Sequence, residues 1–340
     1  MKSILAVFAS LSLLPLPALA DNHDPGAGGV TFDTWQVPWE KSRPRDPYVS
    51  PLNGNVWFVG QAGDYLGVFQ VDKETFLRYG LPDGTGPHNV IIDDSSNAWI
   101  AGNKQGWIGR FDMESRKLKQ FDMPKEIEDP HTLMFDHSNK DGLWFTAQWS
   151  NYLGYLNQET GAVQKWEMPV ERSRPYGLVV TEDGNPWAAL LGTNRLATIK
   201  DSRIPNNAKL DTVMLPRAET RPRRIGLTSD GRVWYVDYAE GYLGVYNPKT
   251  QKAKEWRSPS AGEARPYGMA VDDKDRVWYV ETGPQPNRWI GFDTKTEEFI
   301  SNVEIPDSGG AVRHMDFDPK TNTIWFGMDT NYLGRANLPD

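Results

Sequence analysis

The sequence feature that most constrains the fold is a tryptophan that recurs at nearly constant spacing. Each copy follows a turn rich in Gly, Asp or Asn and a short apolar step, and successive copies lie 42, 45, 43, 47, 44 and 47 residues apart. The seven copies are Trp57, Trp99, Trp144, Trp187, Trp234, Trp278 and Trp325. Self-similarity at such a period is typical of repeat architectures. We therefore expect seven copies of one structural unit.

Each unit contains four short segments with the character of β-strands. In the third unit these segments are DPHTLMF, GLWFTA, YLGYL and AVQKWEMP. They are rich in Val, Ile, Tyr, Phe and Trp and are separated by turn residues, which is the chemistry of strands and hairpins. Four strands per unit of roughly 40–45 residues predict an all-β, seven-bladed β-propeller. In this interpretation the Trp fills the space between blades, and the Gly beside it permits close contact of the sheets.

The segment TFDTWQVP (31–38) matches the last strand of a unit, although no unit precedes it. Near-copies that end other units are TFLRYGLP, KLKQFDMP, AVQKWEMP and KAKEWRSP. The seventh unit supplies only three strands and ends at YLGRANLPD. We therefore predict that residues 31–38 form the fourth strand of the last blade and remove the exposed edge of the ring. The expected single domain spans residues 31–340, after a flexible tail at 21–30.

The first 20 residues have the pattern of a secretory signal peptide. Lys2 precedes an apolar run, and Ala18-Leu19-Ala20 forms a cleavage site of small residues. The run is short for a membrane span, so we expect no membrane anchor and an exported protein, periplasmic or secreted. The absence of cysteine excludes disulfides and thiolate metal sites. A net charge of −8 argues against a nucleic-acid partner. We also expect the protein to be a monomer.

The repeat resembles that of the virginiamycin B lyase (streptogramin lyase) family over residues 31–338. The segments GPHNVIIDDSSNAWIAG, DPHTLMFDHSNKDGLWFTA and RPYGLVVTEDGNPWAAL carry the resemblance best. The resemblance implies a lyase that opens a cyclic depsipeptide antibiotic by elimination across its ester linkage, with magnesium in the site. It also implies an acid–base pair: a His one residue after the repeat Pro and a Glu three residues after the repeat Trp.

No unit of this chain carries both members of that pair. The positions after the proline hold Tyr48, His88, His131, Tyr176, Arg223, Tyr267 and, allowing one inserted residue, Arg313. The positions after the tryptophan hold Gly60, Gly102, Ala147, Leu190, Asp237, Glu281 and Met328. His314 and Asp329 each lie one residue from the aligned positions. Because side chains alternate along a strand, we expect such an offset to point them away from the site.

The residues after the proline are functional candidates on physical grounds as well. The innermost strand of every blade lines the propeller axis, so these side chains converge on one funnel, which is suited to a polar or anionic small molecule with aromatic rings. His88 or His131 would act as a general base, or would hydrogen-bond a neighbouring blade. Arg223 and Arg313 would stabilise an oxyanion, and Tyr48, Tyr176 and Tyr267 would bind the ligand. The alternative is a water-filled channel whose polar lining satisfies itself.

Asp237 and Glu281 lie on adjacent predicted blades and are candidates for sharing a Mg²⁺ or Ca²⁺ ion. Alternatively, they form ion pairs with Arg223 or Arg313.

Three functional hypotheses follow. The chain is a cation-assisted lyase that opens an ester or lactone, with His88, His131 or His314 in proton transfer; a metal-dependent lactonase or hydrolase; or a non-catalytic propeller that binds a ligand or a protein.

Overall fold

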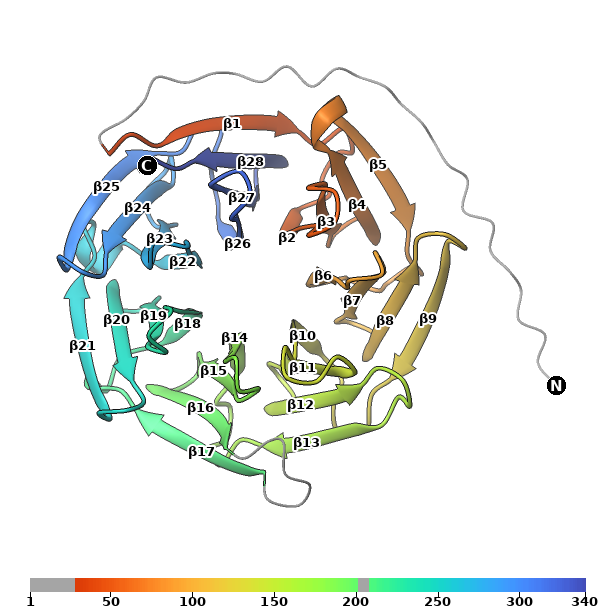
Figure 1. The fold of residues 1–340 in the computed structure, drawn as a ribbon, viewed down its shortest axis with the longest axis horizontal. Helices are drawn as coiled ribbons and strands as arrows, with labels where there is room; N and C mark the ends of the chain where they lie inside the picture. The colour runs from red at the N-terminus through yellow and green to blue at the C-terminus, as the bar shows by residue number, and fades with distance from the viewer. Residues whose placement is uncertain (1–27, 201–207) are drawn as a thin grey trace.

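The computed structural model describes residues 28–200 and 208–340 of the protein. Strands of this part form seven four-stranded antiparallel sheets arranged as a ring around a central axis (Figure 1). The predicted seven-bladed propeller is confirmed. The predicted signal peptide and residues 21–27 of the predicted tail lie outside the described residues. Among the described helices, none has the length and apolar character needed to cross a membrane.

The first four blades each run from the axis outward in chain order. Blade 1 contains β2 (Pro44–Val49), β3 (Val56–Gly60), β4 (Tyr65–Gln70) and β5 (Thr75–Gly80), and blade 2 contains β6 (Val90–Ile92), β7 (Ala98–Gly102), β8 (Trp107–Asp112) and β9 (Lys117–Asp122). Blade 3 contains β10 (Pro130–Phe135), β11 (Gly142–Ala147), β12 (Tyr152–Asn157) and β13 (Val163–Glu167), and blade 4 contains β14 (Pro175–Val180), β15 (Pro186–Leu190), β16 (Arg195–Lys200) and β17 (Lys209–Met214). A short 3₁₀ helix, η1 (Val71–Lys73), connects β4 to β5.

The last three blades include the closure of the ring. Blade 5 contains β18 (Pro222–Leu227), β19 (Val233–Asp237), β20 (Tyr242–Asn247) and β21 (Lys252–Arg257), and blade 6 contains β22 (Pro266–Val271), β23 (Arg276–Glu281), β24 (Arg288–Asp293) and β25 (Glu298–Glu304). A second 3₁₀ helix, η2 (Ala261–Glu263), precedes blade 6. Blade 7 contains β26 (Val312–Asp318), β27 (Thr323–Met328), β28 (Tyr332–Asn337) and, as its outermost strand, β1 (Thr31–Gln36).

Strand β1 closes the ring as predicted. It pairs antiparallel with β28, from Thr31 opposite Asn337 to Gln36 opposite Tyr332 (Figure 1). The Trp35 ring stacks on Trp325 with 5.4 Å between centroids. The two ends of the propeller are therefore joined by both backbone hydrogen bonds and a buried aromatic contact.

The repeated tryptophans and glycines have different packing roles. All seven tryptophans are buried, and they contribute to the apolar clusters that extend from blade to blade. In blades 1, 3, 5, 6 and 7 the glycine of the third strand makes room for an aromatic ring of the second strand in its own blade. A Cβ at Gly154 would lie 2.1 Å from the Phe145 ring, and one at Gly244 would lie 2.1 Å from Tyr235. This within-blade contact refines the expectation that glycine serves sheet-to-sheet approach.

Most inner strands share an irregularity near the axis. In blade 3, Pro130 pairs with Ala147, and pairing resumes with Leu133 opposite Phe145. The register therefore shifts across His131 and Thr132, and the same shift occurs in blades 1, 4, 5, 6 and 7. A bulge of this kind re-aims side chains, and it determines which residues reach the axis.

Candidate functional site

Seven side chains, one from each blade, follow the first residue of the inner strand or its equivalent and surround the axis. This axial ring consists of Arg45, His88, His131, Tyr176, Arg223, Tyr267 and Arg313. The structure corrects the register predicted for blade 1. Pro44 pairs with Gly60 as Pro130 pairs with Ala147, so Arg45 holds this position. Tyr48 lies opposite Trp57 and packs against the apolar clusters between blades.

The residues that come next in the chain form a second set around the axis, which we call the bulge ring. They are Asp46, Asn89, Thr132, Gly177, Arg224, Gly268 and His314. The expectation that an offset of one residue points His314 away from the site is therefore wrong, because strict alternation fails at the bulge. Burial, followed by the charge of Arg224, lowers the pKa of His314 to about 3.

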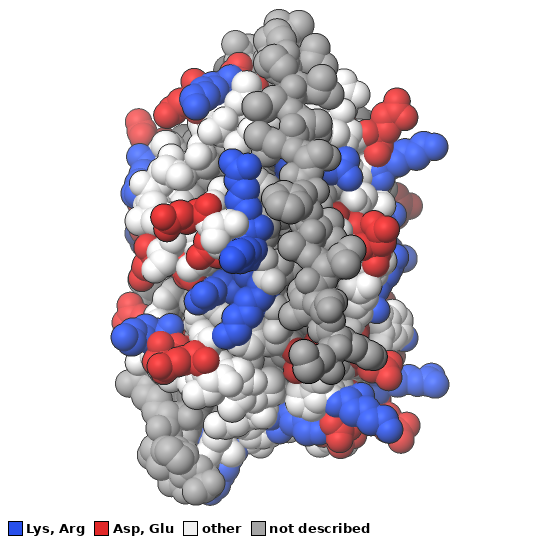
Figure 2. Space-filling model, turned by 90° about the vertical axis from the view of Figure 1, so that its right-hand side faces the viewer, with Lys and Arg blue, Asp and Glu red and all other residues white. Residues whose placement is uncertain are grey.

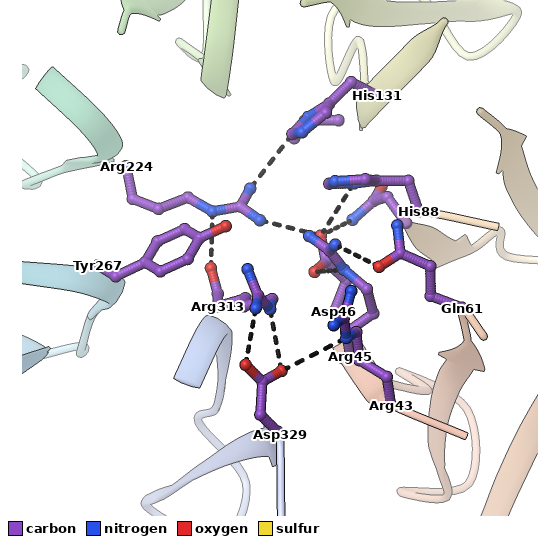
Figure 3. Close-up of polar contacts among 12 residues, drawn as sticks. Arg43, Arg45, Asp46, Gln61, His88, His131, Arg224, Tyr267, Arg313 and Asp329 are labelled. Atoms are coloured by element: carbon purple, nitrogen blue, oxygen red, sulfur yellow. Dashed lines mark hydrogen bonds and ion pairs between the residues drawn. The ribbon is translucent and has the colours of Figure 1, made fainter. Parts of the chain in front are cut away.

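Arg224 crosses the axis and connects blade 5 to three other blades. Its Nη2 donates to Asp46 Oδ2 of blade 1 at 3.0 Å, its Nη1 donates to Thr132 Oγ1 of blade 3 at 3.2 Å, and its Nε donates to the backbone oxygen of Arg313 in blade 7 at 2.9 Å (Figure 3). The side chain is 2% exposed. The middle of the propeller is thus filled by a hydrogen-bonded guanidinium and is not an open channel at this level.

Asp46 is the anion that this guanidinium meets. The residue is fully buried and has φ of 48°, a left-handed conformation that is uncommon outside glycine. Arg45 Nε donates to it at 3.0 Å and Asn89 Nδ2 at 3.2 Å. Burial alone would raise the pKa of the Asp46 carboxyl, but Arg45 and Arg224 hold it well below its usual range. Strained backbone of this kind concentrates at functional sites.

The rings of His88 and His131 contact each other next to this ion pair, with 39° between their planes. Their ring centroids lie 3.5 Å apart, and the His131 ring lies 4.1 Å from that of Tyr176. Burial lowers the pKa of both imidazoles well below the usual range, and the surrounding arginines lower it further. Both rings are therefore neutral near pH 7.

Tyr176 and Tyr267 meet on the other side of the axis. Their hydroxyls form a hydrogen bond, and both side chains are buried. The guanidinium carbon of Arg223 lies 3.5 Å from the centroid of the Tyr267 ring and 4.2 Å from that of Tyr238, and both distances are within the range of a cation–π contact. Arg313 binds Asp329 through two hydrogen bonds, of 3.0 and 2.6 Å.

Asp237 and Glu281 are the last residues of β19 and β23, and the carboxylate of each is bound by neighbouring donors of the polypeptide. Asp237 Oδ2 accepts from Arg217 Nη2 at 2.6 Å, and its Oδ1 accepts from the backbone N–H of Arg221 at 2.8 Å. Glu281 Oε1 accepts from Ser258 Oγ at 2.5 Å and from the backbone N–H of Ser260 at 3.0 Å. The expected alternative of ion pairing is found for Asp237, with Arg217 in place of Arg223 or Arg313.

This donor set does not fit a divalent cation. Mg²⁺ and Ca²⁺ need several free oxygen ligands, whereas the two carboxylates are already engaged by separate polypeptide donors. Within residues 28–200 and 208–340, no group of three or more His, Cys, Asp or Glu side chains is placed to hold a metal ion.

The axial and bulge rings are rich in cationic and unpartnered groups. They hold Arg45, Arg223, Arg224 and Arg313 against the carboxylates of Asp46 and the adjacent Asp329. Buried nitrogens without a hydrogen-bond partner are Arg45 Nη2, His88 Nδ1, His131 Nε2, Arg223 Nε and His314 Nδ1. On the outer edge of the ring, by contrast, basic and acidic side chains are interspersed (Figure 2). The positive cluster is therefore a property of the axis in an otherwise acidic chain.

The rim above the axial ring carries exposed aromatic and cationic groups. Trp149 is 67% exposed and follows β11, whose end pairs with the start of β10. The guanidinium carbon of Arg174 lies 4.3 Å from the centroid of a Trp149 ring. Tyr238 follows β19 at the same end of blade 5 and contacts Arg223. This end of the axis thus combines positive charge with aromatic faces.

Comparisons with known proteins agree with this architecture. Virginiamycin B lyase from Staphylococcus aureus shares 20% identity with this chain and has a TM-score of 0.81, over 91% of this chain and 100% of its own. A streptogramin B lyase structure shares 18% identity, with a TM-score of 0.81 over 91% and 98% of the two chains. Hydrazine synthase from Kuenenia stuttgartiensis shares 12% identity, with a TM-score of 0.71 over 88% and 96%. At these identities the likeness establishes the fold.

The family assignment comes from the sequence itself. A search of curated proteins finds no match. The sequence model of the virginiamycin B lyase family matches residues 28–199, which is half of the chain. With seven four-stranded blades and this match, the chain belongs to the virginiamycin B lyase family.

Proposed function

We propose that this protein is a carbon–oxygen lyase that opens an ester or lactone linkage in an anionic small molecule bound at the axial mouth. The observation that carries the proposal is the cluster of four arginines around Tyr267 and Tyr176, with unpartnered nitrogens among them. Such a cluster can bind a substrate carboxylate and stabilise negative charge that develops during the reaction.

An elimination makes specific demands that this site can meet. A proton is removed from a carbon next to a carbonyl, the electron pair forms a carbon–carbon double bond, and the ester C–O bond breaks to release a carboxylate. Arg223 and Arg313 lie beside Tyr267 and would stabilise the charge on the carbonyl oxygen and on the leaving carboxylate. The mechanism needs a proton acceptor but no bound water.

The rim favours a substrate that also carries an aromatic ring. Trp149 offers an exposed face backed by the Arg174 guanidinium. Stacking on this face would hold one end of the ligand while its anionic group faces the arginines. A small-molecule ligand at this mouth accounts for both the aromatic rim and the cationic axis.

Mass spectrometry with chromatography tests the reaction. Protein comprising residues 31–340 would be incubated with a type B streptogramin and, separately, with aromatic esters that carry a carboxylate. Streptogramin B is the substrate in the name of one structural relative. With the cyclic streptogramin, elimination gives a ring-opened product of unchanged mass and altered retention. With an acyclic ester it gives an alkene and a carboxylic acid whose masses sum to that of the ester, whereas hydrolysis adds one water in either case. Hydrolysed products, or intact substrates throughout, would contradict the lyase proposal.

A non-catalytic ligand-binding propeller is the second candidate. The specific observation in its favour is that no blade pairs a His with a free carboxylate, since Asp237 and Glu281 are bound by the polypeptide. Isothermal titration calorimetry separates the two functions. Binding of the same compounds without product formation would assign the protein to this second class.

A further inference from the structure

The two tyrosines of the axial ring form an unusual pair for a buried site. Tyr267 comes from β22 of blade 6 and Tyr176 from β14 of blade 4, and their hydroxyls are hydrogen-bonded. The exposed fractions are 1% for Tyr267 and 3% for Tyr176. The Tyr267 hydroxyl points toward the axis, where Arg224 and Arg313 also lie (Figure 3). Two phenols in contact can share one proton if the environment stabilises a phenolate.

The surrounding charges provide that environment. Four guanidinium groups act on Tyr267: Arg223, Arg45, Arg224 and Arg313. The carboxylates paired with these arginines are already compensated, because Asp46 is bound by Arg45 and Arg224, and Asp329 is bound by Arg313. The remaining positive charge lies next to the Tyr267 ring. The guanidinium carbon of Arg223 is 3.5 Å from the ring centroid, and that of Arg313 is 5.7 Å from it.

The other titratable groups at the axis are poor proton acceptors. His88 and His131 contact each other and lie among arginines, so a positive charge on either ring is opposed by both burial and its neighbours. His314 is held near Arg224 in the same way. Asp46 is ion-paired with Arg224 and Arg45. The four guanidinium groups instead favour a phenolate at Tyr267.

We propose that Tyr267 acts as the general base of this site in the form of a phenolate whose hydrogen-bond donor is Tyr176. This assignment rests on the proposed elimination. The phenolate oxygen takes the proton from the carbon next to the substrate carbonyl. The C–H electron pair becomes the double bond, and the C–O pair leaves with the released carboxylate. The proton on Tyr267 then passes to solvent, which restores the phenolate.

The acid–base properties of the pair agree with its geometry. Burial would raise the pKa of Tyr267, but Arg223, Arg45, Arg224 and Arg313 lower it to about 7. Burial, followed by the neighbouring Tyr267, raises the pKa of Tyr176. The two partners are therefore set apart as base and donor, a division typical of acid–base pairs in active sites.

The Arg223 side chain covers the Tyr267 ring, so we expect access of a substrate to the Tyr267 phenolate to depend on the anionic group of that substrate. Its guanidinium lies between the rings of Tyr267 and Tyr238, and its Nε has no hydrogen-bond partner. A substrate carboxylate would offer this guanidinium a bidentate partner and draw it off the phenol ring. The substrate class is therefore an ester or lactone that carries a carboxylate close to the acidic carbon.

Ultraviolet difference titration tests the phenolate without any substrate. Wild type, Tyr267→Phe and the control Tyr79→Phe would be titrated from pH 5.5 to 9 while tyrosinate absorbance is recorded. Tyr79 is a suitable control because it packs in the outer strand β5 and burial raises its pKa. We expect about one tyrosinate with a midpoint near pH 7 in wild type and Tyr79→Phe, absent from Tyr267→Phe. A wild-type titration that begins only above pH 9 would overturn the proposal.

Steady-state kinetics on whichever ester the wild type turns over test the catalytic role. Tyr267→Phe should lower kcat about 10²- to 10⁴-fold, the range of general-base catalysis, with KM changed less than about threefold. Tyr79→Phe should match wild type. An active wild type with an unimpaired Tyr267→Phe variant overturns the base assignment alone. A wild type that turns over no ester defeats the proposed function and this role with it, even if the titration detects the phenolate.

Discussion

Each of the seven units has one tryptophan between the blades and one residue in the axial ring. The first position is the same in every unit, whereas the second varies. The interblade position is Trp in every unit, whereas the axial position holds Arg three times, His twice and Tyr twice. Each Trp meets nearly the same surroundings, since one blade packs on the next as all the others do. All seven axial side chains instead meet each other in one place. A symmetric scaffold can therefore carry an asymmetric site, because packing between blades constrains the tryptophan position and leaves the axial position free to vary.

The strongest way to break the scaffold is to remove β1. Deleting residues 31–38 exposes the β28 edge and the apolar faces covered by Phe32 and Trp35, which are 5% and 1% exposed. We expect loss of cooperative unfolding and aggregation, because an open sheet edge pairs with other chains. Circular dichroism during heating and light scattering would measure both. Substitution of the exposed Gln36 in the same strand should leave the melting temperature unchanged, whereas a deletion variant that melts like wild type would refute ring closure.

Breaking the axial network should cost less than breaking the ring. Asp46→Ala leaves Arg224 and Arg45 with uncompensated buried charge, which destabilises by about 3–5 kcal/mol when one partner of a buried pair is removed. Arg224→Met alone should also destabilise. The double variant should recover part of the loss, because replacing both partners of a buried pair by apolar groups is far less costly. Urea unfolding of all four proteins measures the coupling, and additive losses would show that the two residues act independently.

Acid should weaken the axis before it affects the tryptophan core. The pKa values of His88, His131 and His314 are lowered in the folded protein, so below their unfolded pKa near 6.5 the unfolded chain binds more protons. Asp316 opposes this, since burial raises its pKa to about 7 and the folded state keeps its proton. Three protons against one leave a net of about two, so the free energy of unfolding should fall by about 3 kcal/mol per pH unit between pH 6 and 4.

Chemical denaturation at intervals from pH 7 to 4 measures that slope. Tryptophan fluorescence reports mainly the buried rings between the blades, while exchange of the imidazole resonances in NMR spectra reports the axis. His131→Asn would reduce the slope by about one proton, or 1.4 kcal/mol per pH unit. A flat profile would mean that the imidazoles titrate alike in the folded and unfolded chain.

The sequence was sufficient for the ring but only partly for its axis. Repeat length, four strands per unit and the orphan strand at 31–38 predicted seven blades and their closure, because each depends on local patterns that recur. Six of the seven axial residues were also predicted in position: His88, His131, Tyr176, Arg223, Tyr267 and Arg313. Their proposed chemical roles stay predictions.

Two features of the axis were not predictable from a period of two residues. The segment PRDPYV offers two prolines, and only the pairing of Pro44 with Gly60 shows that Arg45, not Tyr48, is the axial residue. The bulge brings Asp46, Arg224 and His314 inward where strict alternation points them away. The dipeptide Arg223-Arg224 was the available signal, because two adjacent arginines at the start of an inner strand need a buried anion.

The smallest expected effect is that of magnesium on stability. Its measurement tests the cation-assisted chemistry that the family resemblance implied. Asp237 and Glu281 already accept hydrogen bonds from Arg217 and from Ser258 and Ser260, so a cation would have to displace those donors before it could bind. We expect millimolar Mg²⁺ or Ca²⁺, or a chelator, to shift the melting temperature by less than about 1 °C, since a ligand stabilises only when it binds the folded state. Arg217→Ala is the informative variant, because it frees Oδ2 of Asp237 while Oδ1 keeps its backbone donors, and it should create a measurable Mg²⁺ dependence. A clear stabilisation of the wild type by Mg²⁺ would instead show that the polypeptide donors yield to the ion, and would restore a metal-assisted reaction to consideration.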